Sequence, residues 1–175
     1  ERIRKYTNYI EKKKLEVATE RQEELDSLNE MYCNVQQDID TAMHFDRRLF
    51  EKTREDEDFL HIYLGQGTIA SSRPIDYKKQ ERLEVGDELT EMPEKIYQLF
   101  EHIDGAPICS DMKDSNAIGI VGTKEALYGM FKNIVIDIAV RHYYGDVRLY
   151  MLVDDEKRYQ WARFLPHLML SLIHI

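Results

Sequence analysis

Two glycines and a lysine in the stretch NAIGIVGTKEALYGMF have the types and order that could hold a phosphate. An apolar segment leads through Gly119 and Gly122 to Lys124, and the residues that follow predict a helix. A phosphate-binding loop uses glycine N–H groups, a lysine for the β and γ phosphates, and a Ser or Thr for Mg²⁺. Thr123 stands where the last glycine is expected, and Glu125 stands where the hydroxyl is expected. The pattern therefore predicts a vestigial nucleotide site.

Asp154 could add a carboxylate to this site. The apolar segment 146–155, DVRLYMLVDD, is typical of a strand buried on both faces, and ligands of open α/β sheets bind beyond the carboxyl ends of such strands. An acidic residue there can hold Mg²⁺ or its water. In the alternative interpretation Asp154 and Asp155 begin a turn and cap the next helix. We favour this alternative because Glu125 removes the hydroxyl that would share the metal.

Other residue types that carry out chemistry do not form a recognisable site in the sequence. No two of the six histidines are four residues apart, and Cys33 and Cys109 lie far apart without a zinc-ligand spacing, so no metal site or disulfide framework is indicated. The acidic residues Asp111 and Asp114 predict a turn between strands. We expect no cofactor, and ATP with Mg²⁺ enters only if the site at Lys124 is functional.

The composition limits the kinds of partner. The chain has 175 residues, a formal net charge of −9, and acidic and basic residues interleaved throughout. Nucleic-acid binding depends on basic surfaces that release counterions from phosphates, so no nucleic-acid partner is expected. No apolar run approaches the roughly 20 residues that cross a bilayer. One compact domain with an extension suits this length.

Residues 1–54 predict a helical extension. The segment contains no proline or glycine, and apolar residues recur at spacings of three and four. Asn34 interrupts this pattern, and Gln37 follows it at the spacing of a capping box, so two helices are expected with a break near Cys33 and Asn34. A solvated helical stalk is the simpler interpretation, and a specific partner surface is the alternative.

Residues 55–168 predict an α/β domain with a mainly parallel sheet and flanking helices, similar to a degenerate P-loop NTPase. A change from helical spacing to alternation marks the first strand, and Pro93 and Gly105 bracket the first helix. The expected strands cover residues 59–64, 75–83, 106–112, 116–122 and 146–155. The expected helices cover residues 91–104, 123–144 and 156–166. Residues 169–175 resemble a translated sequencing-adapter read and are expected to be an artefactual tail.

Three short motifs in the first half of the chain carry a family resemblance. A segment like LWER is followed by D-x-D-F-L and by a strand that ends near R-L-G-x-G. These motifs stand here as Leu49, Phe50, Glu51 and Lys52, then Asp56, Asp58, Phe59 and Leu60, then Tyr63, Leu64, Gly65 and Gly67. Together with the segments GIVGTKEAL, DVRLYMLVDD and YQWARFLPH, they make the chain up to Leu168 similar to the membrane-proximal part of the type VII secretion ATPases, the EssC family of FtsK/SpoIIIE-type motors.

The resemblance implies a role in a large translocation motor. Two transmembrane helices would precede Glu1, residues 1–54 would form the stalk, and the following domain would be the first, degenerate ATPase-like domain. It further implies other subunits of a secretion complex as partners, a homo-oligomer, and a place on the cytoplasmic face of the bacterial cell membrane. The membrane would be reached through segments upstream of this chain.

Three functions remain open at this point. The leading one is a non-catalytic structural and coupling part of a secretion motor. The second is an active P-loop ATPase that drives protein export, and the third is a DNA translocase module of the FtsK type. Thr123 and Glu125 argue against the second, and the acidic balance argues against the third.

Overall fold

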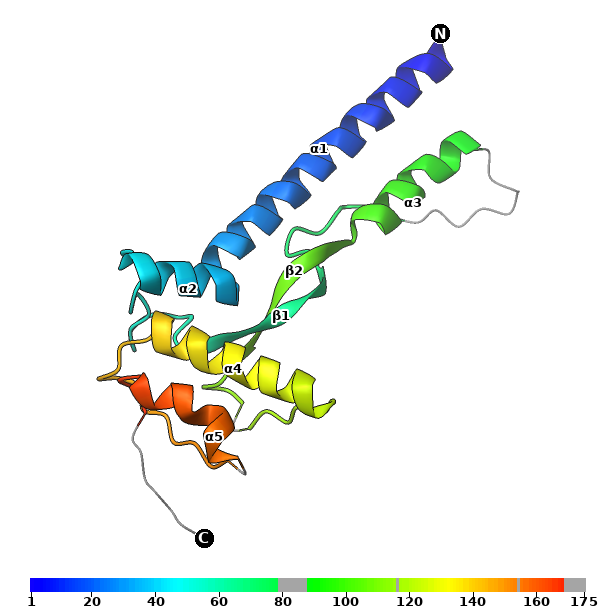
Figure 1. The fold of residues 1–175 in the computed structure, drawn as a ribbon. Helices are drawn as coiled ribbons and strands as arrows, with labels where there is room; N and C mark the ends of the chain where they lie inside the picture. Colours follow the sequence, from blue (N-terminus) through cyan, green and yellow to red (C-terminus); the bar gives the residue numbers. More distant parts are fainter. Residues whose placement is uncertain (79–87, 116, 154, 169–175) are drawn as a thin grey trace. The chain divides into compact units, whose positions relative to one another are not determined.

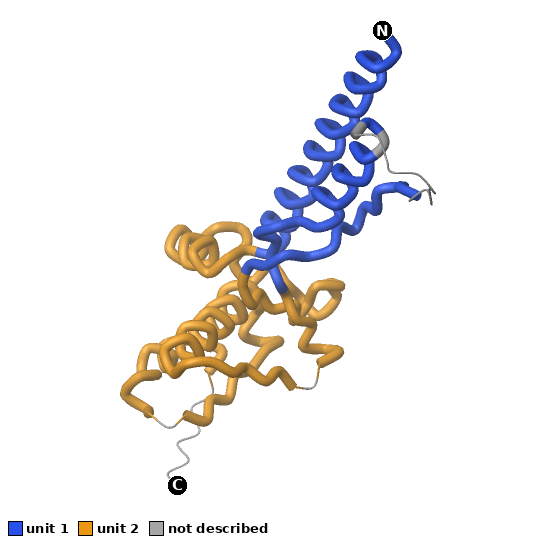
Figure 2. Tube along the Cα trace, turned by 90° about the vertical axis from the view of Figure 1, so that its right-hand side faces the viewer, with its two compact units in different colours: residues 1–32, 66–108 blue, residues 33–65, 109–175 orange. Residues whose placement is uncertain are grey.

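A computed structural model describes residues 1–78, 88–115, 117–153 and 155–168 (Figure 1). The chain forms two compact units, each built from two separate stretches (Figure 2). Unit 1 contains Glu1–Tyr32 and Gln66–Ile108, and unit 2 contains Cys33–Gly65 and Cys109–Ile175. The domain boundaries predicted at residues 54 and 168 stay a prediction. In the described part of the chain, no helix is long and apolar enough to cross a membrane.

Unit 1 is built around two helices that pack against each other, α1 (Arg2–Met31) and α3 (Glu88–Phe100) (Figure 1). A buried ion pair supplements the sparse apolar stripe of α1. Arg21 and Glu24 lie one turn apart, and their side chains are 3.4 Å from each other. Glu24 also accepts hydrogen bonds from the hydroxyls of Ser71 and Ser72, each at 2.6 Å, so its buried charge is well compensated.

The predicted break between the first two helices is confirmed. Helix α2 (Val35–His44) begins directly after Asn34, whose side chain accepts from the backbone N–H groups of Gln36 and Gln37. The Gln37 side chain in turn accepts from the Asn34 N–H at 2.8 Å, which completes the capping box. Local sequence therefore determines where the chain leaves α1.

The predicted mainly parallel sheet is wrong. The described residues contain one sheet of two antiparallel strands, β1 (His61–Ala70) and β2 (His102–Asp111). The apolar segments at 117–121 and 146–153 form no regular strand, and Val121 and Leu152 are 99% and 81% exposed. An apolar run becomes a strand buried on both faces only where neighbouring strands and helices cover it. Segment 146–153 has a single isolated bridge, from Leu149 to Leu168.

Several boundaries also differ from the sequence prediction. Helix α3 ends at Phe100, and residues 102–104, expected to be helical, begin β2. Gly105, expected to follow the helix, lies within β2 with a φ of 71° that favours glycine. The predicted strand at 75–83 is absent from its described part, residues 75–78. The last helix is shorter than predicted, because Leu165 is extended before Pro166. It consists of α5 (Glu156–Tyr159) and the 3₁₀ helix η1 (Gln160–Phe164).

The long helix predicted at residues 123–144 is confirmed as α4 (Lys124–Arg141). It packs against α2 within unit 2. Val135, Ile138, Ala139 and Val140 contribute to the buried core. Because α4 connects the predicted phosphate-binding stretch at its start with a group of buried charges at its end, it positions both of the regions considered below.

Candidate functional site

The predicted phosphate-binding stretch leads into the first turn of α4. Lys124 is the first helical residue, and the Thr123 hydroxyl accepts a hydrogen bond from the Ala126 N–H at 3.3 Å. Thr123 is therefore an N-cap, and it satisfies one of the N–H groups that a phosphate would need. Glu125 lies in the same turn, where a carboxylate interacts favourably with the helix dipole.

Neither glycine of this stretch adopts a conformation that requires glycine. Positive φ values among the described glycines occur only at Gly65 and Gly105. A Cβ at Gly119 would meet no atom within 4 Å, and at Gly122 the nearest atom would be the Ala126 Cβ at 3.8 Å. A phosphate loop needs glycines so that the backbone can approach the ligand closely, and this need is not evident here.

Asp154, the fourth residue predicted for the vestigial site, lies outside the described residues. Its neighbour Asp155 is the N-cap of α5, and its side chain accepts from the Arg158 N–H at 3.3 Å. The capping interpretation is therefore confirmed for Asp155. The grouping of Gly119, Gly122 and Lys124 with Asp154 as a nucleotide site stays a prediction.

A cavity of about 470 Å³ lies beside Lys124 within unit 2. This volume is in the range of small-molecule sites. Aromatic rings make up much of its wall, with Tyr159 edge-to-face against Tyr128 at 5.4 Å and against Phe131 at 5.5 Å. The Arg158 guanidinium lies 4.1 Å from the centre of the Tyr128 ring. Lys124 and Arg158 both line this largely apolar cavity, so it favours an anionic ligand over a cationic one.

The opposite end of α4 contains the largest group of buried charges in the described chain, which we call the α4 charge cluster. Its members come from α2, from the segment between α2 and β1, and from the last turns of α4. They are the buried residues Asp38, Lys52, Asp137, Arg141 and His142, together with Glu51, whose side chain is 30% exposed. Asp38 and His142 are fully buried, and Arg141 is 1% exposed. A charge so far from water needs a partner, so each contact here has a large energetic effect.

Two cations hold the α4 charge cluster together. Arg141 forms an ion pair with Glu51 and donates from Nη1 to the Cys33 Sγ at 3.0 Å. Lys52 lies 3.2 Å from an Asp58 carboxylate oxygen and donates to the His61 carbonyl, also at 3.2 Å. Glu51, Lys52 and Asp58 belong to the motifs that carry the family resemblance, so these motif residues serve internal packing.

The same motifs satisfy the carbonyl groups at the end of α4. The Phe50 N–H donates to the Val140 carbonyl at 2.8 Å, and the Lys52 N–H donates to the Arg141 carbonyl at 2.9 Å. Helix ends leave such carbonyls without intrahelical partners. Phe50 adopts a left-handed φ of 59°, which is costly for a bulky residue and indicates that the surrounding contacts hold it in place.

Burial changes the proton affinities in the α4 charge cluster. It raises the pKa of Asp38 to about 7, and the nearby charge of Asp137 adds to the effect. The pKa of Asp137 is raised to about 6 by burial, against the opposing effect of a hydrogen bond from the Tyr63 N–H at 3.1 Å. Burial and the Lys52 charge lower the pKa of His142 to about 4. The side-chain oxygens of Asp38 have no hydrogen-bond partner among the described residues.

These shifts do not make the α4 charge cluster an active site. Perturbed pKa values mark acid–base catalysts only where a substrate can reach them, and Asp38, His142 and Arg141 have almost no contact with solvent. No group of three or more His, Cys, Asp and Glu that could hold a metal occurs in the described residues. The arrangement therefore acts on packing, by fastening α2 and the motif segment to α4.

The sequence did not predict the buried charge cluster, and no role was assigned to Asp38, Asp137, Arg141 and His142. One signal could have found two of them. Asp137 and Arg141 lie four residues apart inside the apolar run NIVIDIAVRHYY, and charged residues are almost never fully buried unless they are paired. The partners of this pair come from distant segments, which local pattern cannot identify.

Comparison with known proteins finds relatives named as type VII or ESX secretion system proteins. No protein-family model matches the chain. The type VII secretion system protein EssC of Staphylococcus aureus strain MSSA476 is 28% identical over 171 residues, which is 97% of this chain and 12% of the relative. The ESX secretion system protein EccC of Geobacillus thermodenitrificans is 29% identical over 173 residues, with the same coverage. The resemblance found in the sequence is thereby confirmed, and the chain spans about an eighth of the length of these relatives.

Proposed function

From this similarity to EssC and EccC over nearly its whole length, we propose that the chain is a non-catalytic structural and coupling part of a type VII protein secretion complex. Other subunits of that complex, including further copies of the same protein, are its partners. Its place is the cytoplasmic face of a bacterial cell membrane. The alignment over 97% of the chain is the observation that carries this proposal, because it covers both compact units.

The non-catalytic part of the proposal is supported by the start of α4. Phosphoryl transfer depends on positioning and on neutralising the charge of the transferred group. Thr123 is used as an N-cap, and Glu125 brings a negative charge to the turn where the phosphates would approach. Mg²⁺ also lacks its Ser or Thr ligand in this turn. Hydrolysis at this position would therefore lack the last loop glycine, the neutralisation of phosphate charge and the hydroxyl ligand of Mg²⁺.

The structural role in this proposal is supported by the α4 charge cluster. Glu51 and Lys52 of the LWER-like motif contact Arg141 and the end of α4, and Asp58 of the next motif pairs with Lys52. Residues of these types at a surface would suit a partner or a substrate. Here Lys52 is 4% exposed and Arg141 is 1% exposed, so they stabilise the unit that contains them.

Calorimetry with Mg-ATP tests the absence of catalysis directly. The 175-residue chain should give no measurable heat of binding and no phosphate release, and Lys124→Ala should behave identically. A matched control is Lys132→Ala, which removes an exposed lysine from the same helix. Micromolar binding with turnover that only Lys124→Ala abolishes would establish the ATPase alternative instead.

A chimera tests the role in secretion. The segment of Staphylococcus aureus EssC that aligns with this chain is replaced by the chain, and secretion and complex size are compared with those of EssC that lacks the segment. We expect the chimera and its Lys124→Ala variant to restore secretion and complex size equally. A chimera present at normal levels that forms no complex would contradict the proposal, and loss of secretion through Lys124→Ala alone would contradict its non-catalytic part.

A further inference from the structure

Acidic and basic residues are interleaved along most of the chain, but in α1 they separate into two halves. Residues 1–16 contain six basic residues against three acidic ones, whereas residues 17–32 contain one basic residue against five acidic ones. The basic residues of the first half are Arg2, Arg4, Lys5, Lys12, Lys13 and Lys14. All six are exposed. In a chain with a net charge of −9, this basic half is a local exception that indicates an anionic partner.

Four of these cations share one face of the helix with two tyrosines. Residues at spacings of three, four and seven lie on one side of an α-helix. The set that follows this spacing is Arg2, Lys5, Tyr6, Tyr9, Lys12 and Lys13, which we call the basic tyrosine face. The residues Tyr6 and Tyr9 are 38% and 55% exposed.

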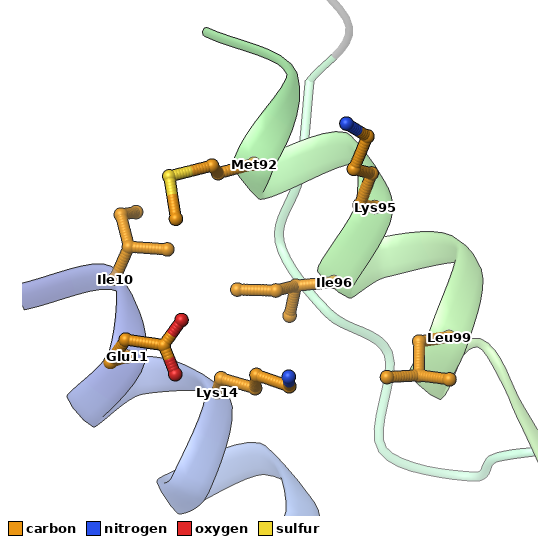
Figure 3. A pocket seen from close by; sticks show the side chains of 7 residues that line it. All are labelled: Ile10, Glu11, Lys14, Met92, Lys95, Ile96 and Leu99. Atoms are coloured by element: carbon orange, nitrogen blue, oxygen red, sulfur yellow. The ribbon is translucent and has the colours of Figure 1, made fainter. Parts of the chain in front are cut away.

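Helix α3 packs against a different side of the same turns. A groove of about 160 Å³ between the two helices is lined from α1 by Ile10, Glu11 and Lys14, and Figure 3 shows these side chains opposite those of α3. The α3 residues are Met92, Lys95, Ile96 and Leu99. By the helical period, the basic tyrosine face is centred roughly half a turn away from this groove. It is therefore left uncovered by α3.

Acidic residues neutralise only part of this face. Lys5 pairs with Glu1 at 2.9 Å, and Glu16 pairs with Lys13 at 2.7 Å and with Lys12 at 3.9 Å. The Lys13 ammonium also lies 6.0 Å from the centre of the Tyr9 ring. Two carboxylates thus face four cations, and exposed pairs of this kind bind only weakly to each other, so an external anion can compete for the cations.

We propose that the basic tyrosine face binds the anionic headgroups of a lipid bilayer. Lys, Arg and Tyr are the residues that favour the headgroup layer, where ammonium and guanidinium groups meet phosphates and the phenol ring spans the polar and apolar regions. The large aliphatic residues Ile3 and Leu15 lie off this face, so a partner helix would find no apolar seam to pack against.

The acidic second half of α1 restricts the contact to the first four turns. Glu20, Glu23 and Glu30 continue the same face by helical spacing, and an anionic surface repels them. The helix therefore meets the bilayer with its first half only. This inference rests on the proposed function and deepens it by assigning lipid binding to residues of this chain. Vesicle binding is measured without secretion, so lipid binding and the role in secretion can fail separately.

Cosedimentation with vesicles is the test. The 175-residue chain is mixed with vesicles of phosphatidylglycerol and phosphatidylcholine in equal amounts, or of phosphatidylcholine alone. We expect binding only to the anionic vesicles, and weaker binding as salt increases. The face variant changes Arg2, Lys5, Lys12 and Lys13 to Gln. Its partition coefficient should be about 100- to 1,000-fold lower, since each of the four cations near an anionic surface contributes about 1 kcal/mol and 1.4 kcal/mol is tenfold.

A charge-matched control separates this face from net charge. The control variant changes Lys113, Lys132, Lys157 and Arg163 to Gln, which removes four exposed cations from unit 2. It should bind anionic vesicles like the parent chain. Equal losses in the face and control variants would overturn the assignment, as would equal binding to both kinds of vesicle. Tighter binding to a short DNA duplex than to anionic vesicles, at equal phosphate concentration, would overturn it in favour of nucleic acid.

A spectroscopic probe then locates the contact. The chain has a single tryptophan, Trp161, in unit 2. In a Trp161→Phe, Tyr9→Trp variant, the only tryptophan lies on the basic tyrosine face. Its emission should shift to shorter wavelength when anionic vesicles are added. Vesicle binding without such a shift would place the contact elsewhere and overturn the proposal.

Discussion

The two long helices α1 and α4 treat their charged residues in opposite ways. Helix α1 has 30 residues, and of its many charged side chains only Arg21 and Glu24 are buried. Helix α4 has 18 residues, and its last two turns bury Asp137 and Arg141. On α1 the charges face water and remain open to partners outside the molecule. At the end of α4 they pair with residues of the same unit.

The contrast between α1 and α4 indicates that the position of a charge, more than its type, decides whether it serves folding or binding. In water a pair of charges interacts weakly and is screened by salt. In a buried position the same pair interacts strongly, and removing one member leaves the other without compensation. We therefore expect substitutions at the end of α4 to change stability and substitutions at the start of α1 to change binding.

The largest effect should come from Arg141→Met. This change keeps an unbranched apolar stem but removes the guanidinium, so Glu51 keeps only its ion pair with Arg48 and Cys33 loses its donor. We expect the free energy of unfolding to fall by about 3 kcal/mol, the low end for a broken buried pair, because Arg141 is buried but Glu51 is partly exposed. Urea unfolding followed by the fluorescence of Trp161, which lies in the same unit, measures it. Arg163→Met, at an exposed position of that unit, is the control. Equal loss in both variants would remove the contrast between the two helices.

Asp38→Asn should have an intermediate effect that depends on pH. The pKa of Asp38 is raised from 3.8 to about 7 in the folded chain, so folding favours the protonated form. Stability is therefore lost as pH rises from about 4 to 7, and a neutral amide avoids this loss. At pH 8 the variant should be more stable than the parent by roughly 2–4 kcal/mol, since one pKa unit is about 1.4 kcal/mol. At pH 4 the two should be nearly equal.

Unfolding curves at several pH values check this expectation. Asp40→Asn changes an exposed carboxylate on the same helix and should shift the curves little at any pH. If the advantage of Asp38→Asn were the same at pH 4 and at pH 8, the proton on Asp38 would not be its cause.

The smallest effect on stability should come from the face variant of α1. Changing Arg2, Lys5, Lys12 and Lys13 to Gln removes only exposed pairs, so the free energy of unfolding should change by about 0.5 kcal/mol or less. Circular dichroism at the helix minimum during urea titration checks this. A loss comparable to that of Arg141→Met would show that these cations serve folding, and it would break the comparison.

Features that depend on neighbours in the chain could be predicted from the sequence. The helix break follows from Asn34 and Gln37, whose side chains bond to backbone groups within three residues. Helix α4 follows from apolar spacing, and β1 follows from alternation that begins near Phe59. The order of the motifs also predicted the kind of relative that comparison identifies. These signals are local or ordered along the chain, and so they are visible without coordinates.

Features that depend on distant neighbours were decided by the tertiary structure. The segment 146–155 has the composition of a buried strand. Its described part nevertheless forms one isolated bridge, and Tyr150 is 71% exposed. Composition does not determine which other segments lie beside a given one. Asp38 and Asp137 look like ordinary helical carboxylates in the sequence. Their pKa values are raised because the packing of α2 against α4 buries both carboxyl groups. Helices could be predicted from residues close together in the chain. The α4 charge cluster could not, because desolvation depends on which groups surround a side chain in space.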